Sequence, residues 1–214
     1  MNPWMGILLW FAVFMGGSIV GGLCPSRKAK IGAGCTSTVF IILSLIVFQF
    51  TGGFEYYGLK IDIFYTVVSI FTAFIIAFPL SLIASRVAEN TNMQKGPFDL
   101  GNLNIFEFSF LLLLLAPLGE ELLFRGILES SLLEYGILIA IVVPALLFSL
   151  IHILPFKNTP RKFLATILIS AFILGLLAGY FRALSGSLLP AYATHAIFNL
   201  NGKIAERLRN RYTL

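Results

Sequence analysis

The feature that most constrains this chain is a series of apolar runs, each about 20 residues long, separated by short polar connectors. About 20 apolar residues are needed for a helix to cross the hydrocarbon core of a bilayer, and only helices and closed barrels satisfy their backbone hydrogen bonds in lipid. The alternation of apolar and polar residues that marks barrel strands is absent. The sequence therefore predicts an all-α, polytopic bundle of transmembrane helices.

Composition agrees with this fold class. Hydrophobic residues make up 58% of the chain and charged residues 12%, whereas a soluble domain has about 25% charged residues. We expect about seven spans, and the boundaries allow six to eight. The expected spans cover residues 3–23, 36–54, 63–85, 105–128, 136–156, 164–181 and 186–202. The last is short and contains Pro190, which predicts a kink or a start below the membrane surface.

The basic residues predict the orientation, because short cytoplasmic loops carry an excess of Lys and Arg. Twelve of the 15 basic residues lie in alternate connectors and in the C-terminal tail: Arg27, Lys28, Lys30, Arg86, Lys95, Lys157, Arg161, Lys162, Lys203, Arg207, Arg209 and Arg211. We expect an integral protein of a bacterial cell membrane, with its N-terminus outside and its C-terminus in the cytoplasm. The net charge of +5 is this topology signal, so the expected partner is the lipid bilayer and not nucleic acid.

Three kinds of side chain near the predicted span ends have simple interpretations. Cys24 and Cys35 flank a basic loop that we place in the cytoplasm, so free thiols are expected. Trp4 and Trp10 fit an aromatic belt at the membrane surface. Arg182 is expected to extend its guanidinium to the outer interface.

Few ionisable residues lie inside the spans, and an ionisable side chain at the bilayer centre costs at least about 2.5–3.5 kcal/mol, so each is a functional hypothesis. His152 and His195 are the only histidines, and they lie on different spans. Glu121 and Arg125 are four residues apart and can pair on one helical face, while Glu120 is rotated by about 100° from Glu121. One carboxylate can thus be neutralised while the other faces a cavity.

Helical geometry predicts that these residues meet. Glu120 lies 15 residues before a turn near residue 135 and His152 lies 17 residues after it, which places both at one level in the cytoplasmic half of the bilayer. His195 and Asn199 share a helical face, and Phe148 lies one turn before His152. Phe148 fits core packing and a substrate-pocket wall equally well.

This set of side chains favours amide hydrolysis. A carboxylate and an imidazole can activate water as general bases, and a histidine and an asparagine can donate hydrogen bonds to an oxyanion. A serine nucleophile is disfavoured because no G-x-S-x-G elbow occurs, and no H-E-x-x-H zinc motif is present. Glu120, His152 and His195 could nevertheless supply the two histidines and one carboxylate of a zinc site, so the metal stays open: no cofactor is needed if Glu and His alone activate the water.

Three motifs carry a resemblance to a known family. "EELLFR" (120–125), "FSLIH" (148–152) and "HAIFN" (195–199) resemble the E-E-x-x-x-R, F-x-x-x-H and H-x-x-x-N motifs of the CAAX-protease and bacteriocin-processing (Abi) family. This family comprises intramembrane endopeptidases and includes the Rce1-type prenyl-protein protease. The resemblance covers roughly residues 105–202.

The resemblance implies a role for each matching position. Glu120 would be the general base acting on water, with His152 helping to activate it, and His195 with Asn199 would stabilise the oxyanion. Glu121 and Arg125 would support the site. The implied enzyme is of the glutamate type or the metallo type and cleaves a membrane-associated peptide or protein.

Two other functions stay open. One is a non-enzymatic membrane scaffold or bacteriocin-immunity protein that keeps these residues as a polar packing cluster. The other is a small transporter, which predicts internal repeats or paired broken helices, and the sequence shows neither.

For the enzyme, we expect N-terminal helices and a loop in residues 1–104, a catalytic transmembrane core in 105–202 and a basic cytoplasmic tail in 203–214.

Overall fold

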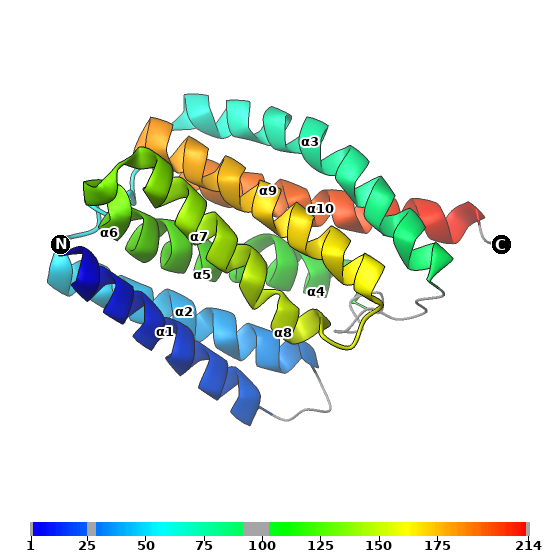
Figure 1. Ribbon diagram of the computed structural model, residues 1–214, viewed down its shortest axis with the longest axis horizontal. Coiled ribbons are helices and arrows are strands. Elements are labelled where there is room, and N and C mark those ends of the chain that lie inside the picture. Colours follow the sequence, from blue (N-terminus) through cyan, green and yellow to red (C-terminus); the bar gives the residue numbers. More distant parts are fainter. Residues whose placement is uncertain (1, 25–28, 92–102, 213–214) are drawn as a thin grey trace.

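The computed structural model describes residues 2–24, 29–91 and 103–212, and within them every regular element is a helix, as the apolar runs predict (Figure 1). The elements are α1 (Pro3–Leu23), α2 (Ala29–Thr51), α3 (Ile63–Asn90), α4 (Ile105–Phe108), η2 (Ser109–Leu115), α5 (Ala116–Glu121), η3 (Leu122–Glu129), α6 (Ser130–Leu132), η4 (Leu133–Tyr135), α7 (Ile137–Ile151), α8 (Ile153–Phe156), α9 (Arg161–Ser185) and α10 (Leu188–Tyr212). Arg27, Lys28 and Lys95, which contribute to the predicted topology, lie outside the described residues.

Five helices in the described part of the chain are long and apolar enough to cross a membrane, so this is an integral membrane protein. They are Pro3–Leu23, Lys30–Thr51, Ile63–Asn90, Ile137–Phe156 and Arg161–Ser185. The two other predicted spans are also helical. The fourth is divided into the short segments from α4 to α6, and the last is α10, whose second half is polar. Pro190 lies in the first turn of α10, where a missing N–H breaks no helical hydrogen bond.

The segments from α4 to α6 form one interrupted helix, which we call the broken helix, through the middle of the bundle (Figure 1). The hairpin of α1 and α2 packs on one side of it. On the other side α10 contacts η2, α5 and η3, and α3 packs along α10. Helix α7 lies against α9 and also contacts η3. The second part of the broken helix, from η3 onward, is thus enclosed by neighbours, whereas Phe106, Phe110 and Leu114 in its first part are exposed.

Two glycines bring α2 directly against the broken helix. A Cβ atom at Gly119 would lie 2.8 Å from the carbonyl oxygen of Ser37, and one at Gly126 would lie 2.4 Å from the Phe48 ring. Real Cβ atoms do not approach other atoms so closely, so only glycine fits this contact without a shift. The close approach fixes the rotation of the broken helix, and with it the direction of its polar side chains.

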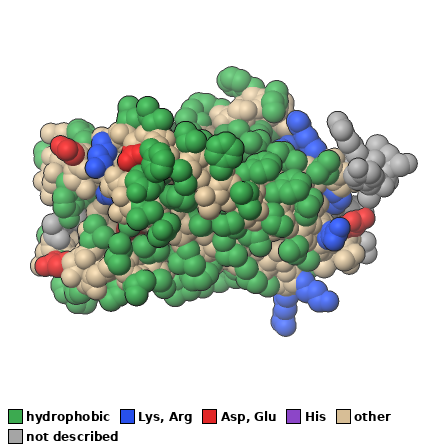
Figure 2. Space-filling view, turned by 90° about the horizontal axis from the view of Figure 1, so that it is seen from above, with side chains coloured by type: hydrophobic (Ala, Val, Ile, Leu, Met, Phe, Trp, Pro, Cys, Tyr) green, Lys and Arg blue, Asp and Glu red, His purple; other side chains and the backbone are tan. Residues whose placement is uncertain are grey.

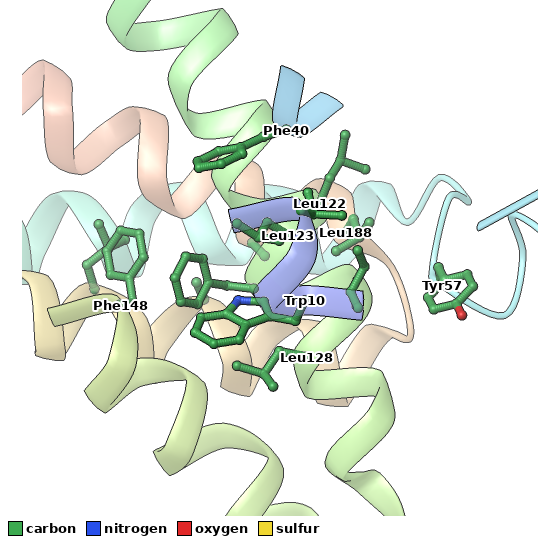
Figure 3. Packing of buried hydrophobic residues seen from close by; sticks show 14 of the residues in the cluster. Trp10, Phe40, Tyr57, Leu122, Leu123, Leu128, Phe148 and Leu188 are labelled. Atoms are coloured by element: carbon green, nitrogen blue, oxygen red, sulfur yellow. The ribbon is translucent and has the colours of Figure 1, made fainter. Parts of the chain in front are cut away.

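A cluster of aromatic side chains fills the space between α1, the broken helix and α7 (Figure 3). The edge of Trp10 meets the Phe124 ring at a centroid distance of 5.6 Å, and Phe124 meets Phe148 in the same way at 5.3 Å. Trp4 is 69% exposed, but Trp10 is only 8% exposed. The aromatic-belt prediction is therefore wrong for Trp10, because its position on α1 faces the core.

The loop between α2 and α3 covers the end of the bundle opposite the predicted cytoplasmic face. Gly58 has a φ of +83°, and a Cβ there would lie 2.8 Å from the guanidinium carbon of Arg182. Arg182 is buried and donates to the hydroxyl of Ser130 at 3.3 Å. The prediction that this arginine extends to the interface is wrong, because the Gly58 loop encloses its guanidinium.

The surface separates by polarity along the bundle. Figure 2 shows hydrophobic side chains covering the middle of the molecule and charged side chains gathered towards its two ends. At one end Lys30, near the start of α2, pairs with Glu107, which also belongs to the capping box at the start of α4. Cys24 and Cys35 carry free thiols. An apolar middle with polar ends is the surface that a bilayer requires.

Candidate active site

The broken helix changes its hydrogen-bond pattern twice around the two adjacent glutamates. The π-helical segment η2 precedes α5, and the π-helical segment η3 follows it. Pro117, at the start of α5, has no N–H with which to continue the pattern of η2. Glu120 and Glu121 therefore lie on a short α-helical segment between two widened ones, an arrangement that is frequent at functional sites.

Glu121 and Arg125 form the predicted i, i+4 ion pair. Arg125 Nε lies 3.2 Å from Glu121 Oε2, and Nη1 donates to Oε1 at 3.3 Å. The third contact, from Nη2 to the carbonyl oxygen of Gly175 on α9, is 3.1 Å. The side chains of both residues are at most 1% exposed. Because both side chains are buried away from solvent, an unpaired charge on either of them would strongly destabilise the fold.

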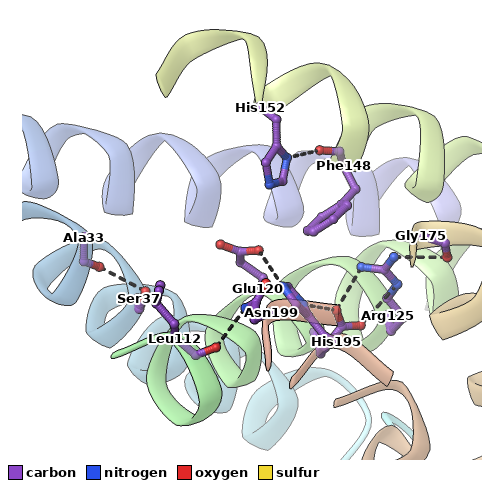
Figure 4. A network of polar contacts seen from close by, with 11 residues as sticks. Ala33, Ser37, Leu112, Glu120, Arg125, Phe148, His152, Gly175, His195 and Asn199 are labelled. Atoms are coloured by element: carbon purple, nitrogen blue, oxygen red, sulfur yellow. Dashed lines mark hydrogen bonds and ion pairs between the residues drawn. The ribbon is translucent and has the colours of Figure 1, made fainter. Parts of the chain in front are cut away.

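His195 joins this pair from α10 (Figure 4). Its Nδ1 lies 2.8 Å from Glu121 Oε1, and its Nε2 lies 3.7 Å from Glu120 Oε2. A carboxylate only accepts, so Nδ1 carries a hydrogen and donates it to Glu121. The orientation of the imidazole is thus set by Glu121, and Nε2 faces Glu120.

Glu120 differs from Glu121 in its exposure. Its side chain is 23% exposed, whereas that of Glu121 is 1% exposed. Glu121 is committed to Arg125 and His195, while the contact of Glu120 with His195 is longer. The two carboxylates therefore face different surroundings, as predicted, and Glu120 is the more exposed of the two.

His152 closes the site from the end of α7. Its Nδ1 lies 2.7 Å from the carbonyl oxygen of Phe148, which can only accept a hydrogen bond. Nδ1 therefore donates, and in the neutral ring Nε2 carries the free lone pair. Figure 4 shows the imidazole extending from α7 towards Glu120. His152 can thus accept a hydrogen bond or a proton on the side of the carboxylate.

Phe148 packs between the polar groups. Its ring meets that of His152 at a centroid distance of 4.8 Å and that of His195 at 5.5 Å, and the guanidinium of Arg125 lies 4.9 Å from its centroid. Phe148 is fully buried. Of its two interpretations, core packing fits this burial, and the ring separates the two imidazoles.

Asn199 lies one turn after His195 on α10. Its Nδ2 donates to the carbonyl oxygen of Leu112 in η2 at 2.8 Å. The amide has a second N–H, which can still serve another acceptor. Asn199 therefore binds the broken helix and keeps one donor for chemistry.

Chemically, the arrangement offers a partly exposed carboxylate, one imidazole with a free lone pair, and a second imidazole oriented by a buried ion pair. These groups come from α5, from the residue that follows α7, and from α10. They can accept a proton from water, hold it and donate hydrogen bonds to a developing negative charge.

Fit to a metal is poor in the described part of the chain. No three His, Cys, Asp or Glu side chains gather closely enough there to hold an ion. Each imidazole does donate Nδ1–H to an oxygen, which is how zinc-bound histidines are commonly oriented. Because the donor set is incomplete, we derive no step through a metal.

Sequence reasoning missed three contacts that shape the site. The carbonyl of Gly175 accepts from Arg125, Tyr192 OH donates to the carbonyl of Leu113 at 2.8 Å, and Glu121 bonds His195. Only Tyr192 has a signal in the sequence, because it lies three residues before His195 and so shares its helical face.

Comparison with known proteins identifies one related family. The model described as "Type II CAAX prenyl endopeptidase Rce1-like" matches residues 102–201. The match begins just before α4 and ends within α10, so it spans the broken helix, α7 and both histidines. No curated protein and no solved structure matches the chain.

Proposed function

Residues 102–201 form a domain of the Rce1-like type II CAAX prenyl endopeptidase family, and from this premise we propose that the protein hydrolyses a peptide bond of a membrane-associated peptide or protein within the bilayer. The observation that carries the proposal is the position of Glu120, whose carboxylate lies 3.7 Å from His195 Nε2 and towards which the His152 ring extends (Figure 4). Buried ionisable groups are costly in a membrane protein, and such a constellation is a functional site by default.

Water is activated between Glu120 and His152. Glu120 is the more exposed of the two carboxylates, and it accepts the proton as the oxygen of the water attacks the scissile carbonyl. His152 orients the same water through the lone pair on Nε2, which is available because Nδ1–H donates to Phe148. Glu120 then returns the proton to the departing amine, so no covalent acyl-enzyme forms.

The oxyanion is stabilised from α10. Asn199 contributes the amide hydrogen that Leu112 does not use. His195 can donate through Nε2 only in its doubly protonated form, because Nδ1–H is already bonded to Glu121. The carboxylates of Glu120 and Glu121 lie one beside each ring nitrogen of His195.

Glu121 and Arg125 act as supports. Arg125 offsets the charge of Glu121 and ties it to α9 through Gly175. The offset lets Glu121 remain in the apolar interior, where it holds His195 in one orientation. The catalytic core in this proposal is residues 105–202, with its site in the cytoplasmic half of the membrane and the C-terminus in the cytoplasm.

The proposal is tested by cleavage assays on purified protein in detergent or vesicles. Two fluorogenic peptides serve as probes: one ends in a prenylated cysteine followed by three residues, and the other has the same sequence without the prenyl group. Glu120→Gln, His152→Ala and His195→Ala are expected to lower kcat at least about a hundredfold, in the range of lost general acid–base catalysis.

Tyr180→Phe is the matched control, because Tyr180 lies half exposed on α9. It is expected to cleave like the wild type. Full cleavage by a folded Glu120→Gln variant would contradict this mechanism, and failure of the wild type to cleave either peptide would favour the scaffold or immunity function. Cleavage of the prenylated peptide alone would assign the substrate class, and cleavage of both would show that the lipid is not required.

A further inference from the structure

We propose that Tyr192 is a positioning residue whose hydroxyl supplies the hydrogen bond that Pro117 withholds from the broken helix, and so holds the turn carrying Glu120 and Glu121 against His195. Its effect on cleavage rests on the proposed function, but the positioning can be measured without turnover.

The need for an outside donor follows from the backbone. In η2 the N–H of Ala116 donates to the carbonyl oxygen of Leu111, five residues back. Continued by one residue, this π pattern would pair residue 117 with Leu112, and a return to the α pattern would pair residue 117 with Leu113. Residue 117 is proline and has no N–H, so neither bond can form.

Both of these carbonyls receive a hydrogen bond from α10. Tyr192 OH donates to Leu113 O, and Asn199 Nδ2 donates to Leu112 O, each at 2.8 Å. In an apolar interior a carbonyl without a donor is costly, so the two side chains stabilise a break that would otherwise be unfavourable. The π segment can therefore persist beside Pro117.

The same face of α10 also carries His195. Tyr192, His195 and Asn199 are spaced by three and four residues, so they form one stripe on the helix. The stripe contacts the broken helix on both sides of Pro117: at Leu113 and Leu112 before it, and at Glu121 after it. Tyr192 thus fixes the distance between His195 and the glutamates from a point outside the family's three motifs.

The test is a double-mutant cycle. Tyr192→Phe removes only the hydroxyl and is expected to lower kcat about three- to tenfold with little change in KM, the scale of one hydrogen bond. Pro117→Ala restores an N–H at residue 117, so in that background Tyr192→Phe is expected to change kcat less than twofold. Tyr180→Phe, on the exposed side of α9, is the control for a lost tyrosine hydroxyl.

A second readout uses the two histidines, which are the only ones in the chain. The ¹⁵N chemical shifts of histidine-labelled protein report which ring nitrogen carries a hydrogen, and a His152→Gln variant assigns the two rings. The wild type is expected to show a hydrogen on Nδ1 of His195. Tyr192→Phe is expected to shift the ring-nitrogen signals of His195, and adding Pro117→Ala is expected to restore them.

The outcomes separate the two proposals. Unchanged His195 spectra in Tyr192→Phe, or equal changes with and without Pro117→Ala, would overturn the role of Tyr192. A wild type that cleaves neither peptide would contradict the proposed function, yet the spectral cycle would still decide whether Tyr192 positions the turn.

Discussion

The buried pair of Glu121 and Arg125 gives the sharpest stability prediction. Arg125→Met keeps much of the side-chain length but leaves Glu121 charged in an interior where its side chain is 1% exposed. Removing one partner of a buried ion pair costs about 3–5 kcal/mol. For a chain of this size each kcal/mol lowers the Tm by about 2–4 °C, so the expected decrease is about 6–20 °C.

The double variant Glu121→Gln/Arg125→Met removes the unpaired charge and leaves an amide oxygen to accept from His195 Nδ1–H. It is expected to regain at least about 2 kcal/mol of the loss. Glu120→Gln is the control, because Glu120 is partly exposed and forms no ion pair with Arg125; it is expected to cost less than about 1 kcal/mol.

Unfolding followed by circular dichroism in detergent measures all three variants. The reasoning depends on charge and not on lost volume. A double variant as unstable as Arg125→Met alone would therefore refute it, and so would a Glu120→Gln variant as unstable as either.

Two further predictions concern packing and metal. Gly126→Ala is expected to lower the free energy of unfolding by about 1–3 kcal/mol, because its Cβ would overlap the Phe48 ring. Thermal unfolding measures this loss of stability. Adding Phe48→Leu should restore the stability if that overlap is the cause. Cleavage is expected to persist with excess chelator, because the described residues do not assemble a three-ligand site. A loss of activity that added zinc reverses would contradict this prediction and assign a metal to Glu120 and the histidines.

The local parts of the site could be predicted from the sequence. The ion pair of Glu121 and Arg125 needs only the spacing of four residues on one helix. The seven helical regions follow from apolar runs, because a bilayer imposes length and composition on every span. The prediction that Glu120 and His152 lie at one level needs only the rise of a helix and the position of the turn.

The remaining features depend on contacts between distant helices. The bond from His195 to Glu121 joins residues 74 apart, and no periodicity specifies which of two adjacent glutamates the ring will meet. The leucine run before Pro117 likewise carries no sign of its π pattern, because leucine suits either helix.

The glycine contacts of α2 have a consequence for how the chain can diverge. Gly119 packs against Ser37, and Gly126 packs against Phe48. Ser37 and Phe48 precede the region that the endopeptidase family model matches. A larger side chain in α2 would push against the back of the segment that carries both glutamates. The first half of the sequence and the matched region can therefore diverge at different rates elsewhere. Where Ser37 and Phe48 contact Gly119 and Gly126, however, a larger side chain in one helix requires a smaller one in the other.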